Sequence, residues 1–83
     1  MELREIIAIN LKFYRFKDNK TQEQFYSESG LNYKYLSKIE NGKINVTVDF
    51  IDNIAKVLKI ERDKLITYDE SHIIDKKRID SKK

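Results

Sequence analysis

The sequence predicts an all-α fold: a compact bundle of five helices in one domain. Three observations predict it. The 83 residues include no proline and only two glycines, so few positions would interrupt a helix. Apolar residues recur at helical spacing in several segments. Polar capping residues or glycines stand where these segments would begin or end.

The first helix is expected over residues 2–18, before the break at 18–20. Its apolar arc is broader than one packing face requires, because two stripes lie side by side. The first stripe is Leu3, Ile6, Ile7, Asn10, Leu11 and Tyr14, and the second is Ile9, Phe13 and Phe16.

A second helix is expected from Gln22 to about Ser29. Thr21, followed three residues later by Gln24, matches a capping box, in which each side chain bonds a backbone N–H at the start of a helix. Gly30 then stands where a helix commonly ends in the left-handed conformation.

A third helix is expected from Tyr33 to about Asn41, with Asn32 as its N-cap and Gly42 at its end. The spacing therefore predicts two short helices joined by the tight connection 30–32, a helix-turn-helix. Three residues are expected to enter the core: Leu31, Leu36 and Ile39.

Thr47 is expected to cap a fourth helix, which contains the most apolar stretch of the chain. Ile60, Leu65 and Ile66 fit a turn and a short fifth helix. The sequence therefore divides into a folded domain over 1–68 and a polar, basic tail over 69–83. The apolar stretch is Val48, Phe50, Ile51, Ile54, Ala55, Val57 and Leu58.

The net charge of +3 does not by itself indicate nucleic-acid binding, because residues 1–70 hold 12 basic and 12 acidic residues. The surplus lies in residues 71–83 of the tail, which is either a solubilising end or a basic arm for the phosphate backbone. The basic residues in 71–83 are Lys76, Lys77, Arg78, Lys82 and Lys83, against Asp75 and Asp80.

The outer face of the third helix indicates DNA binding more specifically. Its residues can all donate hydrogen bonds and none is acidic, whereas a merely solvated face mixes both signs. The major groove admits one helix, and its base edges accept hydrogen bonds from such donors. The face consists of Tyr33, Lys34, Ser37, Lys38 and Asn41, and Gln22, Lys43 and Asn45 are suited to phosphate contacts.

The motifs TQEQF, GLNYKYLSKIENG and NVTV…IAKVLKI resemble the helix-turn-helix domain of phage repressors and Cro proteins, the Xre family. The resemblance covers about residues 3–66 and implies a lambda-repressor-like fold. Restriction–modification controller proteins are a branch of comparable size, and residues 45–48 are similar to theirs.

The resemblance also implies roles for individual residues. Gln22 corresponds to a position that grips a phosphate or supports a base contact. Arg15 and Glu40 correspond to a pair that in many members forms a partly buried salt bridge between the first helix and the end of the recognition helix, with Glu40 facing inward. An exposed pair would contribute little, a partly buried one much more. The base-contacting positions are Tyr33, Lys34, Ser37 and Lys38, and the phosphate-contacting ones are Tyr35 and Asn41.

From their residue type alone, Tyr33 and Tyr35 could instead cover the edge of the core.

Three residues depart from the family pattern. Tyr26 stands in place of a customary alanine between the two motif helices, so its ring should either change the interhelical angle or turn outward. Lys20 and Ser29 replace apolar residues and thin the core of the motif.

These observations predict a DNA-binding transcriptional regulator that acts as a homodimer on a palindromic operator. A protein-binding module, such as an antitoxin or anti-regulator, is the alternative, and acidic or apolar residues on the recognition face would favour it. The expected dimer residues are Val57, Ile60, Leu65, Ile66 and Tyr68, extended by Ile73 and Ile74, and the rival surface is Ile9, Phe13 and Phe16.

Other function classes find little support in the sequence. Cysteine is absent and His72 is the single histidine, so neither a metal site nor nucleophilic catalysis is expected. We expect no cofactor, no small-molecule ligand, no enzymatic activity and no membrane span, and a cytoplasmic location.

Overall fold

The computed structural model describes residues 1–30 and 32–73, and within them it contains helices and no strand. This confirms the all-α prediction. Leu31, Ile74 and the basic residues of the tail lie outside the described residues. The helices are α1 (Leu3–Lys17), α2 (Gln22–Ser29), α3 (Tyr33–Glu40), α4 (Val48–Leu58) and α5 (Asp63–Ile66), followed by the 3-10 turn η1 (Glu70–His72).

Helices α2, α3 and α4 begin at the expected capping residues. The Thr21 hydroxyl accepts a hydrogen bond from the Gln24 amide at 3.1 Å, and the Gln24 side chain accepts one from the Thr21 N–H at 2.8 Å. The Asn32 side chain accepts from two backbone amides at the start of α3. The Thr47 hydroxyl accepts from the Phe50 amide at 3.0 Å. Each cap satisfies donors that the first helical turn leaves unpaired.

The helices end less regularly than they begin. Gly30 adopts the expected left-handed conformation, with φ of 73°. At the end of α4 the same conformation falls on Lys59, with φ of 59° and ψ of 45°. A side chain makes this conformation unfavourable, which is why glycine is usual there.

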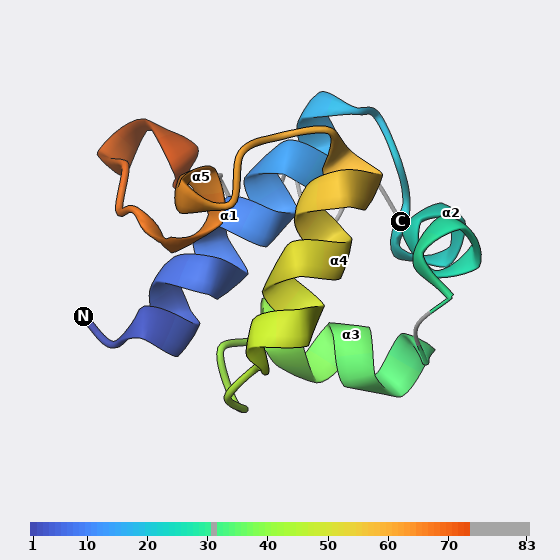
Figure 1. The fold of residues 1–83 in the computed structure, drawn as a ribbon, viewed down its shortest axis with the longest axis horizontal. Coiled ribbons are helices and arrows are strands. Elements are labelled where there is room, and N and C mark those ends of the chain that lie inside the picture. Colours follow the sequence, from blue (N-terminus) through green and yellow to red (C-terminus); the bar gives the residue numbers. More distant parts are fainter. Residues whose placement is uncertain (31, 74–83) are drawn as a thin grey trace.

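Helices α1 and α4 form the centre of the molecule (Figure 1). Helix α1 packs against α3, α5 and η1, and α2 packs against α3 and α4. In the view of Figure 1, α2 and α5 lie at opposite edges. The apolar side chains buried among the five helices form one core: Ile7, Leu11, Phe25, Leu36, Ile39, Phe50, Ile54, Ala55, Leu58 and Leu65.

The packed structure continues past Tyr68. The ring of His72 is stacked on that of Phe13, with centroids 3.8 Å apart, and His72 is only 8% exposed. The interpretation of His72 as part of a polar tail is therefore wrong, because η1 folds back onto α1. Asp69 caps this turn, and hydrogen bonds from Ser71 hold the pKa of its carboxyl below the usual value.

Tyr14 lies beside His72 in an edge-on contact. Burial raises the pKa of the Tyr14 phenol above its usual value, and the negative charges of Asp69 and Asp63 add to the effect. Tyr14 therefore stays protonated at neutral pH.

Candidate nucleic-acid interface

Helix α3 is held by its apolar side and presents its polar side outward. Leu36 and Ile39 are almost completely buried in the core. Lys34 and Lys38 are exposed, and neither forms an ion pair with any residue in the described ranges. The geometry required of a recognition helix is thus present: cationic donors face solvent on one side, and an apolar anchor lies on the other.

The end of α3 lies close to the first helix. Gly42 has a φ of 69°, and a Cβ at this position would lie 3.7 Å from Cα of Glu5 and 3.8 Å from Cβ of Ala8. The left-handed conformation there favours glycine. The left-handed conformation of Gly42 turns the chain away from α3 while the end of the helix stays against α1. The start of the loop that carries Lys43 and Asn45 is therefore fixed in position.

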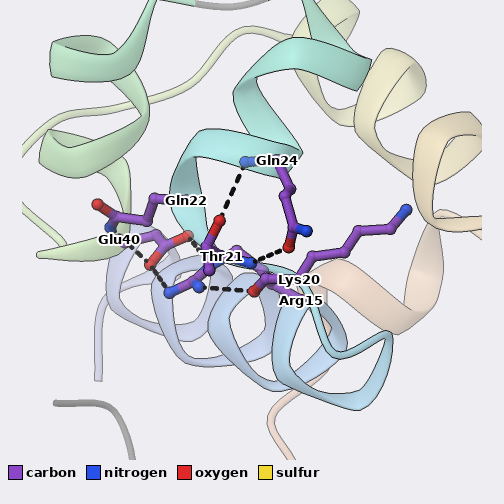
Figure 2. A network of polar contacts seen from close by, with 6 residues as sticks. All are labelled: Arg15, Lys20, Thr21, Gln22, Gln24 and Glu40. Atoms are coloured by element: carbon purple, nitrogen blue, oxygen red, sulfur yellow. Dashed lines mark hydrogen bonds and ion pairs between the residues drawn. The ribbon is translucent and has the colours of Figure 1, made fainter. Parts of the chain in front are cut away.

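A buried ion pair connects the end of α3 to α1 (Figure 2). The Arg15 guanidinium donates from Nε to Glu40 Oε2 and from Nη2 to Glu40 Oε1, both at 2.7 Å. A third nitrogen, Nη1, donates to the carbonyl of Lys20 at 3.0 Å. The two side chains are 4% and 3% exposed, so the pair is buried rather than a surface pair.

Gln22 joins this network from the first turn of α2. Its Nε2 donates to Glu40 Oε1 at 3.1 Å, so one carboxylate is shared by side chains from α1 and α2 (Figure 2). The amide nitrogen carries two hydrogens, and this bond uses one. Because Gln22 is half-buried rather than enclosed, the other hydrogen remains for a ligand at the surface.

The two tyrosines of α3 differ in their surroundings. Tyr35 is half-buried, packs against the core and meets Phe50 edge-on with centroids 5.9 Å apart. Tyr33 is 47% exposed. The aromatic ring of Tyr35 thus serves packing, and Tyr33 is the more accessible of the two. The phosphate contact that the resemblance implies for Tyr35 stays a prediction.

The remaining predicted contact residues lie on α3 or in the loop that follows it. Ser37 is half-buried on α3, and the loop residues are exposed: Asn41, Lys43 and Asn45. Together with Gln22 they border the outer side of α3.

The family departures have clear structural outcomes. Tyr26 is 40% exposed, so its ring turns outward rather than forcing α2 and α3 apart. Lys20 is half-buried, and its Nζ bonds Glu28 Oε1 at 2.8 Å, which ties the turn before α2 to the end of that helix. The Ser29 hydroxyl donates to the carbonyl of Tyr26 at 3.4 Å.

The candidates for a dimer surface need correction. Leu65 is 1% exposed and belongs to the core, so it is unavailable to a partner. Val57 and Ile60 are half-buried and pack against the same core. Ile66, Tyr68 and Ile73 remain, at 41%, 45% and 56% exposed.

The rival surface on α1 is occupied within the subunit. The His72 ring covers Phe13, and the Arg15 guanidinium lies over the Phe16 ring at 4.9 Å from its centroid. Ile9, Phe13 and Phe16 are each only half-exposed as a result.

An apolar face that the sequence analysis did not separate from the core lies at the start of α4. Val48 is 74% exposed, and it lines a groove of about 500 Å³ together with Ile51 and Ile66. We call these three residues the apolar face. The signal was present in the sequence, since apolar side chains of α4 are too numerous for one packing side and Val48 and Ile51 are three residues apart. Charged residues border the groove: Asp52, Glu61, Arg62 and Asp63.

Two further kinds of site are absent from residues 1–30 and 32–73. No group of histidine or carboxylate side chains suited to hold a metal ion occurs in these ranges. No helix in the same ranges is both long enough and apolar enough to cross a membrane.

Known proteins resemble this chain over most of its length. A family model described as helix-turn-helix matches residues 11–65. Control protein C.SmaI of Serratia marcescens is 37% identical over 67 residues, which are 81% of this chain and 80% of that protein. Control protein C.BamHI of Bacillus amyloliquefaciens is 36% identical over 52 residues, covering 63% and 64% of the two chains.

A solved structure shares the fold. The hypothetical transcription factor NHTF from Neisseria superimposes with a TM-score of 0.79 at 24% identity, over 84% of this chain and 80% of that one. The family match and the curated relatives confirm the resemblance drawn from the sequence. The chain belongs to the Xre/Cro-type helix-turn-helix family, whose members are DNA-binding transcriptional regulators and not a family of enzymes.

Proposed function

We propose that this protein binds a specific operator in double-stranded DNA by inserting α3 into the major groove. The observation that carries the proposal is the sorting of charge on α3. Lys34 and Lys38 are exposed and form no ion pair within residues 1–30 and 32–73, while Glu40 is turned inward and neutralised by Arg15. The surface that would meet the DNA is therefore cationic, although the helix as a whole carries two basic residues and one acid.

Each class of contact has a residue suited to it. Lysine donates to the O6 and N7 acceptors of guanine, which gives Lys34 and Lys38 the chemistry for base recognition. Gln22 can donate its second amide hydrogen to a phosphate while its first remains on Glu40. The loop residues Lys43 and Asn45 are exposed and suited to the adjacent backbone.

The proposal includes a homodimer, with the apolar face as its interface. A two-fold interface must be complementary to itself. The apolar face meets this requirement, because it offers both a projecting side chain, Val48, and a groove beside it. The groove is bordered by charges of both signs, and Arg62 already bonds Asp52 at 3.1 Å. Two recognition helices related in this way would contact half-sites about 10–10.5 bp apart.

Regulation of transcription is the role we propose for this binding, and action on DNA would place the protein in the cytoplasm. Two curated relatives are named control proteins, which supports a regulatory role. A protein-binding module without DNA recognition is less consistent with a face that carries two exposed lysines, neither of them in an ion pair within the described part of the chain.

The test begins with selection of bound sequences from random DNA, followed by affinity measurements on the selected operator and a scrambled duplex. Lys34→Ala and Lys38→Ala should each weaken operator binding by about 1–3 kcal/mol and flatten the preference at one base position. Lys56→Ala removes an exposed lysine from α4 and should leave the preference intact. Equal affinity of the wild type for both duplexes would refute the proposal.

A further inference from the structure

A buried polar cluster bonds the backbone on either side of Ile66, one residue of the apolar face. Asn10 of α1 is completely buried, and its side-chain nitrogen donates to the carbonyls of Leu65 at 2.8 Å and Thr67 at 3.0 Å. These carbonyls belong to the residues on either side of Ile66. One side chain from the first helix therefore holds the backbone on both sides of an exposed residue of α5.

The orientation of the Asn10 amide follows from its partners. A carbonyl can only accept a hydrogen bond, so the NH2 group must face Leu65 and Thr67. The Asn10 oxygen then faces Nδ1 of His72 at 2.8 Å and must accept from it, so Nδ1 carries a hydrogen. No buried side-chain nitrogen or oxygen in the described part of the chain lacks a partner, so this cluster is fully bonded.

His72 is itself held in place by aromatic packing. Its ring is stacked on Phe13 at 3.8 Å and meets Tyr14 edge-on at 5.3 Å. The imidazole is therefore a fixed donor to Asn10, and the turn η1 that carries it is coupled to the backbone around Ile66.

Helix α5 depends on these external bonds. It has four residues and no side-chain cap at its start. A single turn forms too few internal hydrogen bonds to be stable alone. Its position is set by burial of Leu65 and by the two bonds from Asn10. Ile66, next to both anchors, is 41% exposed and lines the groove with Val48 and Ile51.

We infer that Asn10 is a positioning residue for the dimer interface: by holding the Leu65 and Thr67 carbonyls it directs Ile66 into the apolar face, and His72 keeps Asn10 in the orientation that this requires. The inference rests on the proposed function, since it assumes that the apolar face joins two copies of this chain. It extends that proposal to residues that a partner copy need not touch.

The test is a double-mutant cycle on the full chain, with the dimer dissociation constant measured by sedimentation and the unfolding free energy measured in parallel. Ile66→Ala should weaken the dimer. Asn10→Ala should weaken it by about tenfold in the wild-type background and by less than about twofold in the Ile66→Ala background. Asn53→Ala, which removes an exposed amide from α4, should leave the dissociation constant unchanged.

A milder pair of variants addresses misfolding of Asn10→Ala. His72→Phe keeps a ring on Phe13 but removes the donor to Asn10, and it should weaken the dimer in the same Ile66-dependent manner. His72→Asn places an amide donor near the position of Nδ1 and should restore dimerisation relative to His72→Phe. A purely structural role would lower stability without this dependence on Ile66.

The outcomes separate the two proposals. An unchanged dissociation constant for Ile66→Ala would show that the apolar face is not the interface, and this inference would fall with it. If Ile66→Ala weakens the dimer and its effect on the dissociation constant only adds to that of Asn10→Ala or His72→Phe, the positioning role of Asn10 is overturned. The proposed interface then stands.

Discussion

Glu40 is the single acid of α3, and its environment explains how an acidic residue can belong to a helix that we propose to enter the groove of DNA. Both of its oxygens are engaged, one by Arg15 alone and the other by Arg15 and Gln22. Bidentate arginine–carboxylate pairs are the strong ones, and removal of one partner leaves a buried charge without compensation. The charge of the outer side of α3 therefore depends on the inward direction of the Glu40 carboxylate.

Replacement of Glu40 by alanine tests this account. The Arg15 charge would remain buried without a counter-charge, so we expect a loss of about 3–5 kcal/mol in the unfolding free energy from chemical denaturation. Glu28→Ala breaks an exposed pair with Lys20 and should cost less than about 1 kcal/mol. Similar losses for the two variants would show that burial adds nothing to the Arg15–Glu40 pair.

The helices are short, and the residues at their ends determine much of where each helix begins and ends. Helices α2 and α3 have eight residues each, below the length at which an isolated helix is stable. Side-chain caps at Thr21 and Asn32 and the left-handed Gly30 supply local signals, and packing supplies the rest. Helix α4 lacks the corresponding glycine at its end, where Lys59 adopts the left-handed conformation.

Glycine is therefore expected to stabilise the protein at the end of α4 and to destabilise it in the interior of the same helix. Lys59→Gly should stabilise the protein by about 0.5–1 kcal/mol, because glycine adopts positive φ without steric cost. Lys56→Gly, three residues earlier within the helix, should destabilise it by about 1 kcal/mol. Thermal unfolding of both variants gives the sign directly, and a destabilising Lys59→Gly would contradict the assigned conformation.

At the scale of the whole molecule, two surfaces of the described residues are suited to contact a partner. One is the polar outer side of α3, and the other is the apolar face formed where α4 begins and α5 ends. Because the surface of a single small domain offers few base contacts, the proposed specificity would depend on joining two copies. The arrangement of the helices thus determines whether recognition helices from two subunits can be placed in register on DNA.

Val48→Asp tests the interface at this scale. Val48 is 74% exposed, so a charge there should leave the subunit folded but oppose burial against a second copy. Sedimentation should show a monomer, and operator affinity should become dependent on protein concentration. Asn53→Asp adds the same charge at an exposed position of the same helix and should retain the dimer. Dimerisation of Val48→Asp with wild-type affinity would remove the apolar face from consideration.

Local features were predictable because they depend on neighbours along the chain. The bounds of α2, the caps at Thr21, Asn32 and Thr47, and the inward direction of Leu36 and Ile39 follow from residue type and helical period. The pairing of Arg15 with Glu40 came instead from the resemblance to a family. The resemblance implied partial burial, and the structure shows that both side chains are almost completely buried.

Long-range features were decided by the tertiary structure. His72 and Asn10 are 62 positions apart, and nothing in the spacing around either residue indicates that a polar turn folds back to bury both. Leu65 and Ile66 are adjacent and equally apolar, yet one lies in the core and the other at the surface. Periodicity assigns a side chain to one side of its helix, but whether that side meets the core or solvent depends on how the helices pack.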